Sequence, residues 1–234
     1  MGKIGFGYGS EWHLLWHLAR HRTSLDDTVR TVTGADHVEW LDFPLRASDG
    51  PIDAEWTGLD FLSDADTKTS WRSFWPQGAG IHNWDAVARM QIGGRSEWLL
   101  VEAKAHCGEI ASSCGAKPEG GLSQIRAALD ATKAALGVEP GRDWLRGYYQ
   151  FCNRLAVLHF LSLHGVTAHL LMIYFTGDVN GDRVCPKDAQ GWQPAIAAQD
   201  AHVGLPQGHQ LEARIHKAFL PAFANLRGPV SRPS

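Results

Sequence analysis

The chain has 234 residues, of which 44% are hydrophobic, and its 22 basic and 25 acidic residues give a net charge of −3. This composition excludes disorder over most of the chain, and the near-balanced charge excludes a protein that binds nucleic acid through bulk positive charge. A local basic cleft remains compatible with it. The length suits one large domain, so we expect a single domain over residues 1–227 and a disordered tail over residues 228–234.

The sequence shows no sign of a membrane span. Its most apolar region, Leu155–Phe175, is interrupted by three histidines and a glycine, whereas a span needs about 20 apolar residues in a row. The N-terminus lacks the apolar stretch and cleavage site of a secretory signal. The four cysteines form no CxxC pair, which argues against structural zinc and a disulfide framework. We therefore expect a cytoplasmic protein without a membrane partner.

The N-terminal third begins with a predicted helix and a predicted strand. Residues 10–22 carry apolar residues at helical spacing after Ser10, which we expect to be the N-cap of the helix. Residues 37–45 indicate a strand that ends at Pro44. Residues 46–80 are irregular and long for a loop, so we expect short strands or a functional lid there.

A β-hairpin is predicted at the centre of the sequence. Residues 84–92 alternate in character, the pair Gly93-Gly94 follows, and residues 97–105 form a second strand-like run. Two such runs separated by a Gly-Gly turn signal are typical of a hairpin.

The C-terminal half alternates between helices and a strand. Its expected elements are helices over residues 121–136, 144–164 and 209–224 and a buried strand over residues 167–176. Strands interspersed with helices predict an α/β fold in which a mixed central sheet is flanked by helices on both faces.

Three charged residues lie at one end of the predicted hairpin. Glu102 and Lys104 are two residues apart in a strand, so their side chains share one face. A two-residue loop places Asp85 directly opposite Glu102, and a four-residue loop places it opposite Lys104. Either register gathers two carboxylates and one ammonium group.

This group suits the hydrolysis of phosphodiesters. Two carboxylates and a backbone carbonyl form a hard, all-oxygen site for Mg²⁺ or Mn²⁺, which can polarise a phosphate and lower the pKa of a bound water. An ammonium group can stabilise the charge that develops on the phosphorane or position that water. The alternative is a surface salt bridge between Glu102 and Lys104 beside an unrelated Asp85.

In these residues the sequence resembles the PD-(D/E)XK nuclease superfamily, whose members share the restriction-endonuclease-like core. The resemblance rests on Asp85, the hairpin, the motif Glu102-Ala103-Lys104 and the helix that follows. It implies that Asp85, Glu102 and the Ala103 carbonyl bind the divalent metal and that Lys104 takes part in hydrolysis. The family includes DNA nucleases, RNA nucleases and members that have lost activity.

The resemblance covers about residues 80–175 and departs from the family at Trp84, where proline is usual. Some members carry a Glu on the first helix that completes the metal site, which makes Glu11 a candidate ligand. Exonuclease-like members carry a Gln on the helix after the lysine, which makes Gln124 a candidate catalytic residue. The alternatives are a Glu favoured by the helix dipole and an ordinary exposed helix residue.

The resemblance therefore implies a nuclease that depends on Mg²⁺ or Mn²⁺, with DNA as the expected partner and substrate. Arg154 or Asn153, in the predicted helix over residues 144–164, is a further candidate for the cleft. The alternative function is an inactive scaffold of the same fold that acts as an interaction or nucleic-acid-binding protein. The sequence leaves open the strandedness of the substrate, the mode of cutting and the oligomeric state, including a homodimer.

Overall fold

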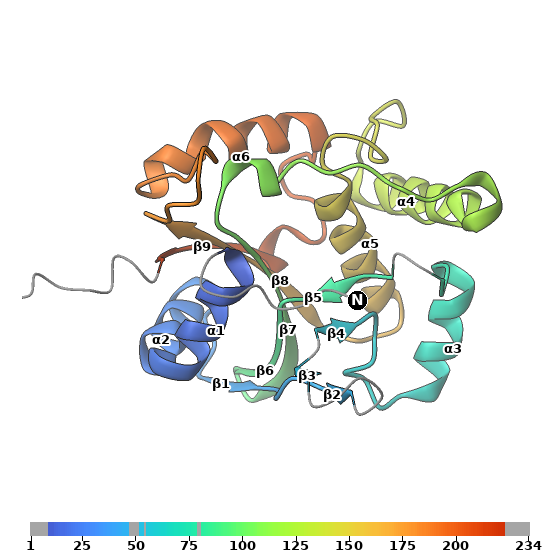
Figure 1. Cartoon of the computed structure of the whole chain (residues 1–234). Helices are drawn as coiled ribbons and strands as arrows, with labels where there is room; N and C mark the ends of the chain where they lie inside the picture. The colour runs from blue at the N-terminus through green and yellow to red at the C-terminus, as the bar shows by residue number, and fades with distance from the viewer. Residues whose placement is uncertain (1–8, 47–51, 54, 79–80, 223–234) are drawn as a thin grey trace, which may run out of the picture.

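A computed structural model describes residues 9–46, 52–53, 55–78 and 81–222 (Figure 1). The predicted tail over residues 228–234 lies outside these described residues. The strands of the main sheet are β1 (His37–Trp40), β6 (Ala86–Ile92), β7 (Arg95–Lys104), β8 (Ala168–Thr176) and β9 (Ile215–Pro221). Two strand pairs stand apart from it: β2 (Leu45–Arg46) with β3 (Ile52–Asp53), and β4 (Trp56–Thr57) with β5 (Asn83–Trp84).

The main sheet has the order β1-β6-β7-β8-β9. β1, β6 and β7 pair antiparallel, whereas β7, β8 and β9 pair parallel, so the sheet is mixed. The helices are α1 (Ser10–Arg20), α2 (Arg22–Thr33), α3 (Ala65–Phe74), α4 (Leu122–Leu136), α5 (Tyr149–Leu163) and α6 (Ala189–Val203). The predicted α/β class, with a mixed central sheet flanked by helices, is confirmed.

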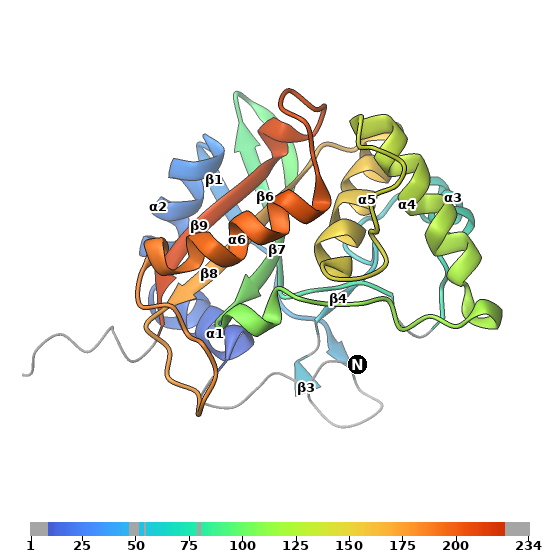
Figure 2. The ribbon, with the colours of Figure 1, turned by 90° about the horizontal axis from the view of Figure 1, so that it is seen from above.

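Two hydrophobic cores lie on opposite faces of the sheet. α1 and α2 cover one face, where Leu14 belongs to the same core as Val101. α4, α5 and α6 lie on the other side, where Leu155 of α5 belongs to the same core as Leu100 and Met172. Figure 2 shows α1 and α2 on one side of the strands and α4 and α5 on the other. Because successive residues of a strand face opposite ways, β7 contributes alternate side chains to the two cores.

The hairpin between β6 and β7 has the tight connection that its sequence predicts. Ile92 pairs with Arg95, and the two residues between them are Gly93 and Gly94, with φ of 55° and 78°. Positive φ at both central positions is the requirement of a type I′ turn, which glycine meets without strain. This turn fixes the register along both strands.

The N-terminal region differs from the prediction in detail. The predicted helix over residues 10–22 ends at Arg20, and α2 follows after His21 as a second helix that was not predicted. Ser10 is the first residue of α1, and Gly9 holds the N-cap position that we assigned to Ser10. Only two residues of α2 are buried, so its sequence carries a weak apolar pattern. The irregular region contains short strands, as expected, and also α3.

The predicted helix over residues 209–224 is wrong. Residues Ile215–Pro221 form the edge strand β9, in which Ala218 and Leu220 are buried two residues apart. The helix before it, α6, was missed because Gly191 and Pro194 resemble helix breakers. Gly191 lies in the first turn of α6 and Pro194 lies inside the helix, where Trp192, Ile196, Gln199 and Val203 form a buried helical stripe.

The helices of the described ranges do not include one that is both long and apolar enough to cross a bilayer.

Candidate active site

Asp85 and the Glu102–Lys104 pair lie together at the end of the hairpin. The strand pairing ends where Ala86 pairs with Val101. Asp85 lies one residue before this pair, and its N–H donates to the Val101 carbonyl at 3.1 Å. Lys104 Nζ forms a buried ion pair with Glu102 Oε1. Of the two registers that the sequence allowed, the structure has the one with the two-residue turn.

Glu102 and Lys104 lie on the face of the sheet that is covered by α5. Leu100, two residues before Glu102 in β7, belongs to the core that includes α5. Glu102 and Lys104 are 2% and 7% exposed, whereas Asp85 is half-buried. Asp85 is therefore the member of the cluster most open to a ligand that approaches from solvent.

The start of α5 provides two polar partners for this cluster. Arg154 donates to Glu102 Oε2 through Nε at 3.0 Å and through Nη2 at 2.7 Å. Gln150 Oε1 accepts from Lys104 Nζ at 3.0 Å. Residues four apart in a helix are separated by about 6 Å along its axis, and residues two apart in a strand by about 6.6 Å. The polar pair of α5 is therefore in register with the charged pair of β7.

Further contacts hold the Arg154 guanidinium in place. Nη2 also donates to the Asn83 carbonyl at 2.6 Å, and Nη1 donates to Asn153 Oδ1 at 2.9 Å. The guanidinium lies 4.6 Å from the centre of a Trp84 ring. Asn83 and Trp84 form β5, directly before Asp85. Arg154 thus links α5 to both strands that carry the carboxylates.

The pKa values of the two carboxylates, Asp85 and Glu102, are shifted in opposite directions. Burial raises the pKa of Asp85 well above its ordinary value, and the neighbouring Glu102 carboxylate raises it further. Burial alone would also raise the pKa of Glu102, but the Lys104 and Arg154 cations outweigh it and hold that pKa below its ordinary value. Glu102 is therefore ionised in the folded protein, and an additional cation would stabilise the ionised form of Asp85 more than that of Glu102.

The donor types at this cluster fit a hard divalent cation. Asp85 Oδ2 accepts the Ala103 N–H at 2.6 Å. The N–H and carbonyl of one strand residue point to the same side, so the Ala103 carbonyl also lies on the edge of β7 that faces Asp85. Both Glu102 oxygens are held by Lys104 and Arg154, so a metal ion has to displace one of these contacts. The described residues include no group of three or more His, Cys, Asp or Glu side chains arranged to hold a metal.

The predicted accessory ligand Glu11 lies in the first turn of α1. It precedes Leu14 and Leu18 on one helical stripe, and these two leucines belong to the core under the opposite face of the sheet. The ring of His13 lies 5.3 Å from that of Phe175, so α1 begins near the ends of β7 and β8. Glu11 is thus at the correct end of the sheet but on the other side of it, and its role as a ligand stays a prediction.

The predicted catalytic residue Gln124 is held elsewhere. Its side-chain amide donates to the carbonyls of Arg72 and Ser73 at 3.0 Å each, and so closes the last turn of α3. The structure does not bring it to Lys104. The glutamine that contacts Lys104 is Gln150, which our sequence analysis did not select.

A signal for Gln150 exists in the sequence. Gln150 and Arg154 are polar residues four apart in a helix whose next residues, from Leu155 to Leu161, are all buried. Polar residues at this spacing share a helix face and need partners when that face is buried. Arg154 was a candidate for the cleft, and its position against Glu102 agrees with that expectation.

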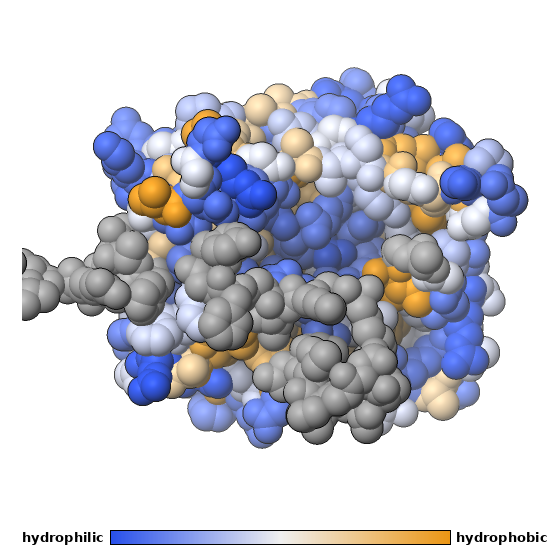
Figure 3. Space-filling view, viewed as in Figure 1, coloured by the Kyte–Doolittle hydropathy of each residue, from blue (hydrophilic) through white to orange (hydrophobic). Residues whose placement is uncertain are grey.

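A hydrophilic hollow lies near the centre of the face seen in Figure 1 (Figure 3). It is in the region where Figure 1 draws β5 and the start of α5. These are elements that flank the charged cluster. Comparison with protein-family models, with curated proteins and with solved structures finds no match for this chain.

We expect His82→Phe to make stability less dependent on pH. The His82 ring is buried 4.5 Å from that of Trp75, and burial, followed by the Arg154 cation, lowers its pKa well below 6.5. Below pH 6.5 the unfolded chain binds a proton that the folded state excludes, so stability is lost as pH falls. Thermal unfolding at about pH 7 and about pH 5 measures this loss. The exposed His37→Phe is the control. If His82→Phe loses as much stability between the two pH values as His37→Phe does, buried His82 is not a source of the pH dependence.

Proposed function

We propose that this protein is a nuclease that hydrolyses phosphodiester bonds of nucleic acid and depends on Mg²⁺ or Mn²⁺. One observation carries the proposal: Asp85, which accepts the Ala103 N–H, lies close enough to the Glu102–Lys104 ion pair for Glu102 to raise its pKa. Structural salt bridges do not need a second carboxylate with a raised pKa beside them. Such a carboxylate is a marker of functional sites, and a divalent cation would stabilise its ionised form.

The chain's own residues have distinct roles in this proposal. Asp85, Glu102 and the Ala103 carbonyl would hold the metal, which supplies a polarised phosphate and a water of lowered pKa. The Lys104 ammonium stabilises negative charge on the phosphorane and orients the attacking water. Gln150 holds Lys104 through its 3.0 Å contact, and so acts as a positioning residue.

We propose DNA as the substrate, on the strength of the resemblance to PD-(D/E)XK nucleases and of the two cations in the cluster. We also place the activity in the cytoplasm, since the four cysteines are all free thiols, as expected in a reducing compartment. The test is incubation with double-stranded DNA, single-stranded DNA and RNA, each with Mn²⁺, with Mg²⁺ and with a chelator. Cleavage of RNA alone would correct the substrate, and cleavage in the chelator would refute the metal requirement.

A second function has its own supporting observation. Both oxygens of Glu102 are engaged by cations of the chain, so this carboxylate is neutralised without a metal ion. This arrangement favours a non-catalytic scaffold that binds nucleic acid or a protein partner. Absence of cleavage on every substrate, together with absence of Mg²⁺ and Mn²⁺ binding by calorimetry, would favour the scaffold.

Asp85→Asn is expected to abolish Mg²⁺ binding and to raise the melting temperature in chelator. The amide keeps the shape of the side chain and can still accept the Ala103 N–H, but it removes the charge that faces Glu102. Relief of about 1 kcal/mol raises the melting temperature by about 2–4 °C in a chain of this size. Calorimetric titration and thermal unfolding provide the measurements, with the exposed Asp60→Asn as control. Retained Mg²⁺ affinity in Asp85→Asn would remove Asp85 from the metal site.

A further inference from the structure

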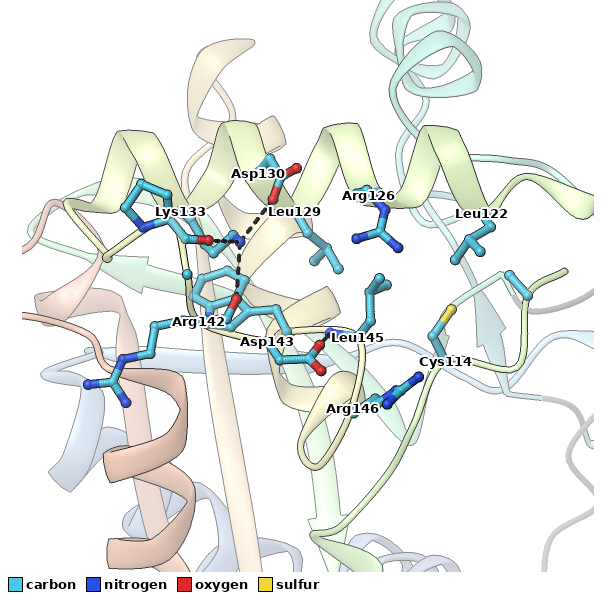
Figure 4. A pocket seen from close by; sticks show the side chains of 14 residues that line it. Cys114, Leu122, Arg126, Leu129, Asp130, Lys133, Arg142, Asp143, Leu145 and Arg146 are labelled. Carbon is cyan, nitrogen blue, oxygen red and sulfur yellow. Dashed lines mark hydrogen bonds and ion pairs between the residues drawn. The ribbon is translucent and has the colours of Figure 1, made fainter. Parts of the chain in front are cut away.

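A cavity of about 620 Å³ lies between α4 and the loop over residues 137–147 that leads from α4 to α5 (Figure 4). We call it the α4 cavity. Its volume lies within the range of about 300–1,000 Å³ that is usual for small-molecule sites. None of the residues of the charged cluster at Asp85 and Glu102 lines it. Any ligand of the α4 cavity is therefore separate from the proposed nuclease site.

The walls of the α4 cavity are fixed in the folded protein. The buried Lys133 ammonium donates to the carbonyls of Pro140 and Arg142 at 3.0 and 3.1 Å, and pairs with Asp130 at 2.9 Å. On the other side of the loop, the Trp144 indole donates to the Val203 carbonyl of α6 at 3.0 Å. Because both sides of the loop are tied down, a ligand meets a preformed site and does not have to order the loop.

Two arginines provide the available positive charge of the α4 cavity. Figure 4 shows Arg126 pointing from α4 toward Leu145, with Arg146 on the loop below. Neither guanidinium has a hydrogen bond or ion pair with a described residue. Arg142 is already used, since it donates to the Ala201 carbonyl of α6 at 2.6 Å. Arg126 and Arg146 are therefore ready to bind an anion.

Two carboxylates also line the cavity, and one of them is paired with a cation. Asp130 pairs with Lys133, and Asp143 Oδ1 accepts the Leu145 N–H at 3.0 Å. The remaining wall is apolar, formed mainly by the side chains Leu122, Leu129, Trp144 and Leu145. The cavity thus combines an apolar surface for a flat or aliphatic group with two guanidiniums for an anionic head.

From this combination we infer that the α4 cavity binds a small organic phosphate of mononucleotide size. Guanidinium groups form paired, charge-assisted hydrogen bonds with phosphate oxygens, and Arg126 and Arg146 both line the cavity. The apolar wall formed by Leu129 and Leu145 accommodates the base or another apolar group of the ligand. This inference stands independently of the proposed nuclease activity.

Calorimetric titration in chelator tests the inference. The titrants are AMP, TMP, adenosine, inorganic phosphate and a 5′-phosphorylated DNA oligonucleotide. We expect the nucleotides to bind the wild-type protein, and we expect adenosine and inorganic phosphate each to bind at least about tenfold more weakly, since each lacks one half of the ligand. Arg126→Gln and Arg146→Gln should each weaken AMP binding by at least about tenfold. The exposed Arg95→Gln is the matched control.

The inference would be overturned by no nucleotide binding by the wild type at millimolar concentration, by unchanged AMP binding in both arginine variants, or by adenosine binding as tightly as AMP. Tighter binding of the oligonucleotide than of AMP would also overturn it, and would make the cavity part of a nucleic-acid groove. Asp85→Asn should bind AMP like the wild type. If AMP bound in the proposed nuclease site as a reaction product, this substitution would change its affinity, whereas a ligand of the α4 cavity does not contact Asp85. Melting curves verify that each variant is folded.

Discussion

Lys104→Ala is expected to lower the rate of phosphodiester hydrolysis by about 10²–10³-fold while the protein stays folded and still binds Mg²⁺. The ammonium acts mainly on the attacking water and on the charge of the transition state. Loss of such an interaction lowers kcat without an equal loss of ground-state binding. The structure explains why the fold survives, since Glu102 keeps its two hydrogen bonds from Arg154.

Cleavage kinetics, calorimetric Mg²⁺ titration and thermal unfolding provide the three readouts for this prediction. Lys104→Met serves as a second variant, because it keeps the apolar stem that fills the buried position. The exposed Lys117→Ala is the matched control and should cleave at the wild-type rate. Cleavage at the wild-type rate by Lys104→Ala would refute the proposed role of Lys104, whereas a parallel loss of Mg²⁺ affinity would make it a part of the metal site.

The parts of the fold that local pattern determines were predictable. Alternating side chains and the Gly93-Gly94 turn specified the hairpin and its charged end, because the strand period and a two-residue turn leave few registers. The edge strand at Ile215 was not predictable in this way. It is half-exposed and short, so its apolar residues match a helical spacing as well as an alternating one, and its pairing with β8 decides its conformation.

In the candidate site, too, local sequence patterns predict some of the contacts, and the packing of distant segments decides the others. The closeness of Asp85 to Glu102 follows from one hairpin, although Asp85 lies just outside the paired part of β6 and not directly opposite Glu102. The choice of Gln150 over Gln124 depends on which helix packs on β7, which no local pattern reveals. Gln124 lies on α4, one helix further from the sheet, where its amide closes α3.

Arg154→Met is expected to destabilise the metal-free protein by about 3–5 kcal/mol, because it removes a buried cation together with both of its hydrogen bonds to Glu102 Oε2. This loss is a large part of the total stability of a domain, which is about 5–15 kcal/mol. The variant also removes the donor to the Asn83 carbonyl. Urea unfolding in chelator measures the effect, and the exposed Arg72→Met is the control.

The double variant Glu102→Met with Arg154→Met separates a buried ion pair from simple loss of packing. When both charges are removed, an apolar pair of similar volume is often as stable as the original ion pair. We therefore expect the double variant to recover most of the stability that Arg154→Met loses. If the double variant is as unstable as Arg154→Met, the guanidinium stabilises the fold through Asn83 and Trp84, and its contact with Glu102 contributes little.

Addition of Mg²⁺ to these unfolding experiments tests the metal site without an activity assay. In the wild type the ion has to displace a contact of Glu102, whereas in Arg154→Met the Oε2 side of Glu102 is open. At a concentration tenfold above its Kd for Arg154→Met, Mg²⁺ should stabilise this variant by about 1.4 kcal/mol. We expect the same concentration to stabilise the wild type less. Adding Asp85→Asn to Arg154→Met should abolish this gain. If Mg²⁺ stabilises Arg154→Met no more than it stabilises that double variant, Arg154 is the permanent cation of Glu102, and the non-catalytic scaffold is the better account of the chain.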